Sequence, residues 1–297
     1  MNPLIMLNEV QIEEIRKLAK DKREYLGIAS EVPIGNDIFT ILEKLDIILL
    51  EYPIYPIYSK DDSPDFSAAI MYSEEDNREL TFIGLNTADY FDKQVFAIAH
   101  ELYHYFTKTG SHISRLNDID NNLLEAKANR FAAEFLFPEI ALKSIIINEF
   151  KTSKLEKTSD KTLMRFMVRL QCSWWLPYRS IVKRLSEISA ISKEQYNRFY
   201  DIDVRNLESE HAKIGIAFNS EVYSKLNKKT NKIGTSAKDI EIIIRNFEDG
   251  LIDEDKFAEV LDLFDKTPDD FGYKITVSDE DLEEFEDFFS GGNLDED

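Results

Sequence analysis

The stretch that decides the fold reads Phe96-Ala97-Ile98-Ala99-His100-Glu101-Leu102-Tyr103-His104-Tyr105. Apolar residues recur at helical spacing from Val95 to Phe106, so the sequence predicts an amphipathic helix that carries this stretch. His100 and His104 are four positions apart, which places them one turn apart on the same helical face. Both rings can then direct a nitrogen atom to one metal ion, and this spacing is typical of zinc sites.

Glu101 completes the HExxH pattern that the two histidines define. Its side chain is rotated by about 100° from that of His100, so it is not a ligand but can approach a water molecule on the metal. This position favours a general base. The pentapeptide also arises by chance, and paired histidines on a helix are often solvated or hydrogen-bonded in a core. A third metal ligand is therefore needed to support the interpretation.

A catalytic zinc site typically has three protein ligands and one open position. A third histidine at the spacing HExxHxxGxxH would occupy position 110, where the chain has Gly110, so that pattern is absent. The polar loop that follows holds three weaker candidates: His112, Asp118 and Asp120. Glu125 is favoured, because it begins the next predicted helix 21 residues after His104, which is enough for the chain to reverse direction. A carboxylate near a helix N-terminus is also common without any metal.

The segment that begins at Glu125 reads Glu125-Ala126-Lys127-Ala128-Asn129-Arg130-Phe131-Ala132-Ala133-Glu134-Phe135-Leu136-Phe137-Pro138. Together with residues 96–105, this segment resembles the ImmA/IrrE family of metallopeptidases, in which an AHELGH helix precedes an ExxANxFAAxLLxP helix. The resemblance extends over about residues 8–190 and is strongest over residues 96–138. Tyr103 stands where the family usually has glycine, and Phe137 where it usually has methionine.

The resemblance implies a zinc ion (Zn2+) held by His100, His104 and Glu125, with Glu101 as the catalytic base. The spacing argument leads to the same residues. Mechanistically, a peptidase of this kind hydrolyses an amide bond, and an extended substrate can add to an exposed strand such as residues 66–72.

Several neighbouring residues have predicted supporting roles. Ala128 and Ala132 lie on the turns after Glu125, and their small side chains allow the second helix to pack closely on the first. Asn129 can hydrogen-bond beside the metal site, although an exposed polar position is an equal alternative. An oxyanion donor should complete the site. Its candidates are Tyr90, Tyr103, Tyr105 and His112.

The flanking patterns predict an α+β fold: a zincin-like metallopeptidase core with a small mixed sheet and the HExxH helix, then a helical, helix-turn-helix-like region and an acidic C-terminal extension. Further expected helices cover residues 8–20, 37–45, 123–137, 140–150, 237–247 and 254–264, and expected strands cover 47–54, 66–72 and 80–85. A helix pair at 161–170 and 176–188, with a turn at Gln171-Cys172-Ser173, resembles the segment that follows the core in the same family. The predicted domains are residues 1–150, 151–205 and 206–297, the last with a flexible end.

The charge and composition of the chain argue against several classes of protein. The net charge of −21 is concentrated in residues 248–297, where 20 acidic residues against 3 lysines leave the rest of the chain at only about −4. A nearly neutral body argues against direct binding of nucleic acid, which requires clustered Lys and Arg. The single Cys172 excludes an internal disulfide or a cysteine metal site and fits a cytoplasmic location. No apolar run reaches the roughly 18 residues of a membrane span, so no membrane association is expected.

The resemblance implies an intracellular, regulatory zinc endopeptidase whose protein substrate is a helix-turn-helix transcriptional repressor. The alternative is a non-proteolytic toxin, effector or interaction protein that pairs with a DNA-binding antitoxin and whose metal site is structural or vestigial. The intact Glu101 favours catalysis. The acidic tail can attract the basic DNA-binding face of a repressor, although a purely solubilising extension is the simpler interpretation.

Overall fold

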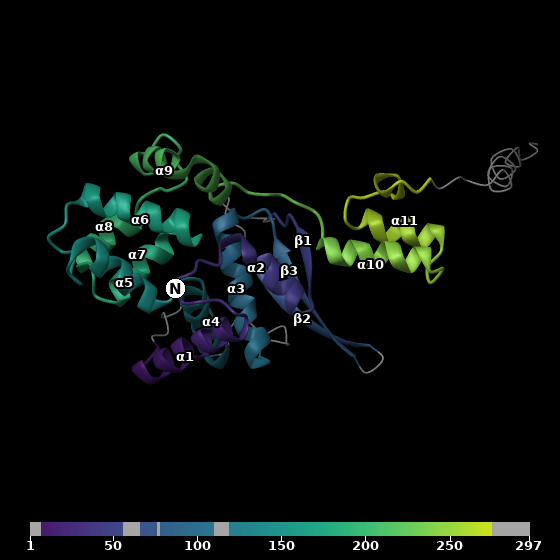
Figure 1. Ribbon diagram of the computed structural model, residues 1–297, viewed down its shortest axis with the longest axis horizontal. Coiled ribbons are helices and arrows are strands. Elements are labelled where there is room, and N and C mark those ends of the chain that lie inside the picture. The colour runs from purple at the N-terminus through teal and green to yellow at the C-terminus, as the bar shows by residue number, and fades with distance from the viewer. Residues whose placement is uncertain (1–6, 56–65, 76–77, 110–118, 275–297) are drawn as a thin grey trace, which may run out of the picture. The chain divides into compact units, whose positions relative to one another are not determined.

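Helices dominate the described part of the chain, which comprises residues 7–55, 66–75, 78–109 and 119–274 of a computed structural model (Figure 1). They are α1 (Glu9–Tyr25), α2 (Ile38–Lys44), α3 (Phe91–Thr107), α4 (Ile119–Leu136), α5 (Glu139–Phe150), α6 (Asp160–Trp174), α7 (Tyr178–Glu187), α8 (Lys193–Tyr200), α9 (Glu210–Leu226), α10 (Ala237–Glu248) and α11 (Glu254–Asp262), with short 3-10 helices η1 (Gly35–Asp37) and η2 (Pro268–Phe271). Within these ranges, no helix combines the length and apolar character that crossing a membrane requires. The chain divides into two units, residues 1–236 and 237–297.

The described part of the first unit contains a small mixed sheet. Its strands are β1 (Ile47–Tyr52), β2 (Ala68–Glu75) and β3 (Arg78–Asn86), in the order β1-β3-β2. β1 runs parallel to β3, with Ile47 opposite Thr81, and β2 runs antiparallel to β3, with Ile70 opposite Ile83. The predicted α+β class and its small mixed sheet are therefore confirmed.

The helix α3 connects the sheet to α4. Its side chains Val95, Ile98 and Leu102 are fully buried, and the helix contacts β2 and β3 as well as α4. This is the apolar face that the helical spacing predicts. On the facing helix, Ala128 and Ala132 are also fully buried, and their spacing of three and seven residues from Glu125 places them on the helical face that reaches the α3 histidines.

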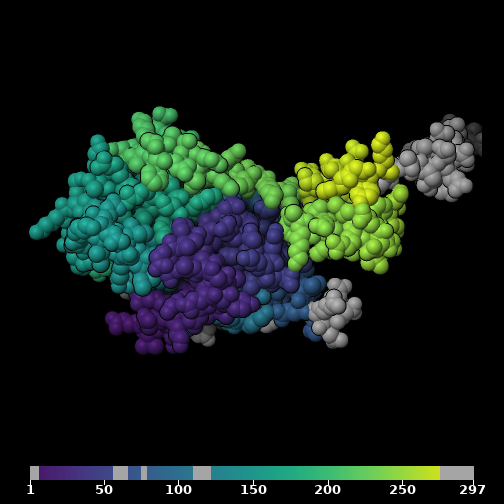
Figure 2. Space-filling view, in the orientation of Figure 1, coloured from purple at the N-terminus to yellow at the C-terminus, as the bar shows by residue number. Residues whose placement is uncertain are grey.

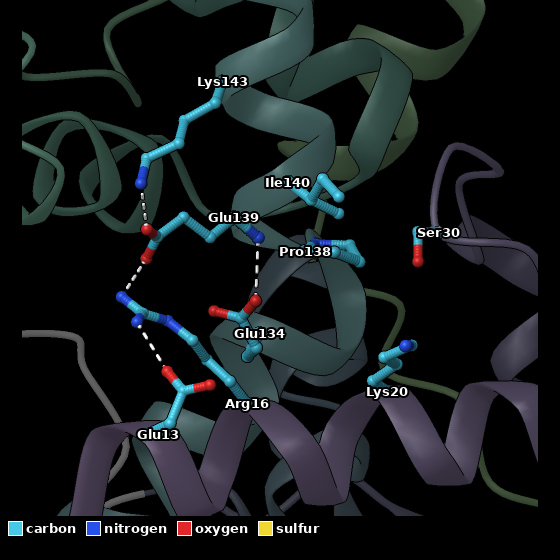
Figure 3. A pocket seen from close by; sticks show the side chains of 9 residues that line it. All are labelled: Glu13, Arg16, Lys20, Ser30, Glu134, Pro138, Glu139, Ile140 and Lys143. Atoms are coloured by element: carbon cyan, nitrogen blue, oxygen red, sulfur yellow. Dashed lines mark hydrogen bonds and ion pairs between the residues drawn. The ribbon is translucent and has the colours of Figure 1, made fainter. Parts of the chain in front are cut away.

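Buried charged side chains fix the C-terminal end of α4. Glu134 Oε2 accepts a hydrogen bond from Arg184 Nη2 of α7 at 2.7 Å, and Glu134 Oε1 accepts one from the backbone nitrogen of Glu139 at 2.7 Å. Arg130 Nη2 lies 3.6 Å from the Glu134 carboxylate. Arg16 of α1 forms an ion pair with Glu139, and Figure 3 shows side chains from α1, α4 and α5 meeting around a cavity of about 400 Å³. These contacts join the end of α4 to α1, α5 and α7.

The helical region begins as predicted but turns later than expected. The helix expected to end at residue 170 continues as α6 to Trp174, because the side chains of Gln171 and Cys172 are buried and extend its core face. The chain turns at Trp175, which adopts a left-handed conformation with φ of 58°, and α7 follows Pro177. The predicted turn at residues 171–173 is therefore wrong.

After α8 the chain returns to the sheet and covers the edge of β1. Arg205 Nη2 donates to the buried Asp92 in the first turn of α3 at 2.7 Å. Glu51 of β1 and Gly234 exchange two backbone hydrogen bonds of 2.8 and 3.0 Å. Between these points α9 packs on α6, and Figure 2 shows its green surface against the teal surface of the helical region. The two compact units of the structure divide at 236/237. The division into residues 1–150, 151–205 and 206–297 stays a prediction.

The second unit has an aromatic core of its own. The expected helices at 237–247 and 254–264 are present as α10 and α11. The ring centroids of Phe247 and Phe257 are 4.3 Å apart, and that of Tyr273 lies 5.5 Å from Phe257. Residues 275–297, which contain the predicted flexible acidic end, lie outside the described residues.

We expect the substitution Glu134→Ala to lower the free energy of unfolding by about 1–3 kcal/mol, because it removes the acceptor of Arg184 Nη2 and of the buried Glu139 backbone N–H, while Arg184 and Arg130 keep their ion pairs with Glu187. Urea denaturation measures this loss. The control is Arg198→Ala, which breaks an ion pair with Asp160. Both side chains are about half exposed, so this change should have little effect on the free energy of unfolding. Equal losses in the two variants would contradict a structural role for the buried network.

Acid should destabilise the first unit through His211 of α9. Burial, together with the positive charge of Arg205, lowers the pKa of this histidine from 6.5 to about 4. Between these pH values the unfolded chain binds a proton at His211 and the folded chain does not, so the free energy of unfolding falls as the pH is lowered from 6.5 to 4. The shift corresponds to a loss of about 3 kcal/mol. Urea denaturation across this window should show a shallower pH dependence for His211→Gln than for the parent protein, and parallel curves would refute the assignment.

Candidate metal centre

The two histidine rings of α3 face each other across one helical turn. The Nε2 atoms of His100 and His104 are 3.3 Å apart, and the ring centroids are 5.2 Å apart. His104 has a side chain that is 4% exposed, whereas that of His100 is 14% exposed. The helix therefore presents two nitrogen atoms side by side, as the four-residue spacing predicts, with His104 the deeper of the pair.

Glu125 reaches the same point from the second turn of α4. Its Oε2 lies 3.0 Å from His100 Nε2, and its Oε1 lies 3.6 Å from His104 Nε2. One ligand atom from each of these three residues lies within 4.8 Å of the other two, which is a separation that one metal ion can span. The Glu125 side chain is 45% exposed, so the group is open to solvent on the side of α4.

The other candidate ligands are not among the described side chains. His112 and Asp118 lie outside the described residues, and the side chain of Asp120, in the first turn of α4, is not described either. Among the described side chains, His100, His104 and Glu125 form the one cluster whose geometry can hold a metal ion.

Glu101 lies beside the cluster on a different face of α3. Its side chain is buried, and Oε2 accepts a hydrogen bond from the backbone nitrogen of Ile70 in β2 at 3.0 Å. Burial raises the pKa of this carboxyl, and the negative charge of Glu125 adds to the effect. A carboxylate with a raised pKa is a better proton acceptor near neutral pH than an exposed one. Both features separate Glu101 from the three clustered donors.

The surroundings of the cluster act differently on its three donors. Burial, together with the charge of the neighbouring His100, lowers the pKa of His104 to about 4. Burial also opposes protonation of His100, but the hydrogen bond with Glu125 and the nearby carboxylates outweigh it and raise its pKa. The hydrogen bond with His100 lowers the pKa of Glu125. His104 therefore presents a neutral ring, and Glu125 an ionised carboxylate.

Each histidine has a polar neighbour at its other ring nitrogen. Asn129 Oδ1 of α4 lies 3.2 Å from His100 Nδ1, so the predicted polar neighbour of the site does contact a histidine. Thr109 Oγ1 lies 3.3 Å from His104 Nδ1. The sequence carries no signal for Thr109, because its approach depends on the left-handed turn at Lys108, where φ is 52°.

The tyrosines considered as oxyanion donors have different surroundings. The Tyr103 ring packs against Phe131 with a centroid separation of 5.6 Å, and its side chain is buried between α3 and α4. Tyr105 donates its hydroxyl proton to the backbone oxygen of Leu45, the C-cap residue of α2, at 3.3 Å. Tyr90 is the N-cap of α3, about 15 Å along the helix axis from the histidine pair. The Tyr103 ring also lies edge-on to the ring of His104, with a centroid separation of 5.6 Å, so Tyr103 is the tyrosine of the three that contacts a histidine of the cluster.

Comparison with known proteins identifies one domain. Residues 58–173 match the sequence model of the peptidase M78 family, described as the IrrE N-terminal-like domain. The matched range includes both motif segments and the three clustered donors. No curated protein and no solved structure matches the chain significantly.

Proposed function

Because residues 58–173 form an IrrE N-terminal-like peptidase domain, we propose that the chain is a zinc-dependent endopeptidase with its metal on His100, His104 and Glu125. The observation that carries the proposal is the convergence of these three donors within 4.8 Å. The resemblance to the ImmA/IrrE family predicts the same three ligands.

The donor set fits zinc. Two imidazole nitrogens and one carboxylate are the ligands of a common class of catalytic zinc site, which keeps a further position for water. The exposed side of Glu125 supplies an entry path for the ion and for a substrate. Zinc bound here would acidify a water molecule and polarise the carbonyl group of a peptide bond.

Glu101 would move the protons of this reaction. Its carboxylate accepts a proton from the attacking water and passes it to the nitrogen of the leaving amine as the carbon–nitrogen bond breaks. Its pKa, raised by burial, suits both steps because the group must be a base first and an acid afterwards. Its bond to Ile70 holds the carboxylate on the β2 side of the cluster.

The outer edge of β2 supports an extended polypeptide as the substrate. Ile70 donates its backbone N–H to Glu101 rather than to β3, so its backbone groups point away from the sheet. Since antiparallel pairs alternate, Ala68 and Tyr72 have the same orientation. A peptide that adds to this edge passes directly beside Glu101. This arrangement suits an endopeptidase, which must accept chain on both sides of the cleaved bond.

A helix-turn-helix repressor is the substrate that the family resemblance favours. The acidic extension is compatible with such a partner, since the DNA-binding face of a repressor is basic. The repressor encoded beside the gene is the first protein to test.

The purified protein should bind about one zinc ion per chain, and His100→Ala, His104→Ala or Glu125→Ala should each remove most of it. Elemental analysis measures the content. Glu208→Ala, which changes an exposed glutamate outside the cluster, serves as the control. Full zinc occupancy in Glu125→Ala would assign the third ligand elsewhere, and His112 would be tested next.

The substitution Glu101→Gln should retain zinc and the fold but reduce cleavage by about 10²–10⁴-fold, because an amide cannot accept the proton. Mass spectrometry of the neighbouring repressor and of a peptide library, each incubated with zinc-loaded protein, locates and quantifies the cuts. Glu221→Gln makes the same chemical change on the exposed face of α9 and should cleave at the parental rate.

A native cleavage rate in Glu101→Gln would show that another group is the base. If the zinc-loaded parent protein cleaves neither the repressor nor the library, the non-proteolytic alternative replaces the peptidase.

A further inference from the structure

Different chemical groups contact the Nδ1 atoms of the two histidines. His100 faces the amide oxygen of Asn129, and His104 faces the hydroxyl of Thr109. An amide oxygen only accepts hydrogen bonds, whereas a threonine hydroxyl accepts or donates. The tautomer of His104 therefore depends on the direction in which the Thr109 hydroxyl points.

A second threonine determines that direction. Thr107 Oγ1 lies 2.8 Å from the backbone oxygen of Tyr103 and 2.7 Å from Thr109 Oγ1. A carbonyl oxygen can only accept, so Thr107 uses its single hydroxyl proton on Tyr103. Thr109 must then donate to Thr107, and its oxygen is left to accept a proton from His104 Nδ1.

We infer that Thr107 and Thr109 form a hydroxyl relay that keeps the proton of His104 on Nδ1 and leaves Nε2 free to face Glu125. The inference rests on the proposed function, in which His104 Nε2 binds zinc. Both threonines are positioning residues, because neither belongs to the donor cluster. Thr107 acts on His104 only through Thr109.

The end of α3 is shaped so that the relay can form. Lys108 is in the left-handed conformation, and the Thr109 nitrogen donates to the His104 carbonyl at 3.1 Å. This reversal brings the Thr109 hydroxyl back over the histidine ring. A threonine hydroxyl bonded to the carbonyl four residues earlier is common in helices. A purely structural role for Thr107 would leave the tautomer of His104 unaffected, so the tautomer separates the two interpretations.

Loss of the relay has a direct consequence for metal binding. Without Thr107 to accept its proton, the Thr109 hydroxyl can rotate and donate to His104 Nδ1. The histidine proton then moves to Nε2, between His100 and Glu125, and must be displaced before an ion binds. Groups that orient a metal-binding histidine typically contribute about 10–100-fold to metal affinity.

The first test determines the tautomer in the metal-free, full-length protein. Long-range ¹H–¹⁵N spectra of histidine-labelled protein in mildly alkaline buffer distinguish the two tautomers, and His104→Gln identifies the signals of His104. The parent protein should carry the proton on Nδ1. Thr107→Val and Thr109→Val should each shift His104 towards the Nε2-protonated form, while Thr109→Ser and the exposed control Thr40→Val should not. If valine at 107 prevents folding, Thr107→Ala removes the same hydroxyl with less bulk.

A parent protein with the His104 proton on Nε2, or an unchanged tautomer in the variants that lack the Thr107 hydroxyl, overturns the relay.

The second test measures zinc affinity by competition with a chromophoric chelator. Thr107→Val and Thr109→Val should bind zinc about 10–100-fold more weakly than the parent protein. Thr109→Ser, which keeps the hydroxyl, should have nearly the zinc affinity of the parent. Unchanged affinity in both valine variants would overturn the relay while the peptidase proposal stands. Failure of the parent protein to bind zinc would overturn the proposed function, and the tautomer spectra would still decide the relay.

Discussion

The packing of α4 on α3 is the contact on which the candidate centre depends. The histidine nitrogens belong to one helix and the Glu125 carboxylate to the other, so they meet only if the helix axes approach closely. Ala128 and Ala132 allow this approach, since each is fully buried and neither extends beyond a methyl group. A larger side chain at either position would separate the helices and move Glu125 away from His104, which it reaches at 3.6 Å.

Buried ion pairs fix one end of each of the two helices. Arg205 holds Asp92 in the first turn of α3, and Arg184 holds Glu134 in the last turns of α4. Burying such charges costs free energy that their mutual attraction offsets only when the geometry is good. These ion pairs matter for the site because they hold both helices in one orientation through groups outside the donor cluster. The segment after α8 is therefore part of the framework of the site, although the two motifs lie far before it in sequence.

The roles of the carboxylates follow from their surroundings. Glu125 is half exposed and faces two imidazole nitrogens, whereas Glu101 is buried and bonded to the backbone of β2. The pKa of Glu125 is therefore lowered and that of Glu101 is raised, although both side chains are glutamates. Pairs of acidic groups whose environments push their pKa values apart are characteristic of sites that combine ligand and proton-transfer roles. The sheet edge that bonds Glu101 is also the edge that a peptide would follow.

The sequence by itself determined the three strands, the helices other than α8 and α9, and the pair of histidines on α3. These features depend on local periodicity, and the four-residue spacing places His100 and His104 together on any regular helix. Only the tertiary structure decided where α6 ends, because burial of Gln171 and Cys172 against other elements overrides the local turn signal. It also decided that Glu125 reaches the histidines, that Thr109 folds back over His104, and that Gly234 pairs with β1. Each of these contacts joins residues through a chain reversal or across long sequence separations, and its geometry depends on packing that no local pattern encodes.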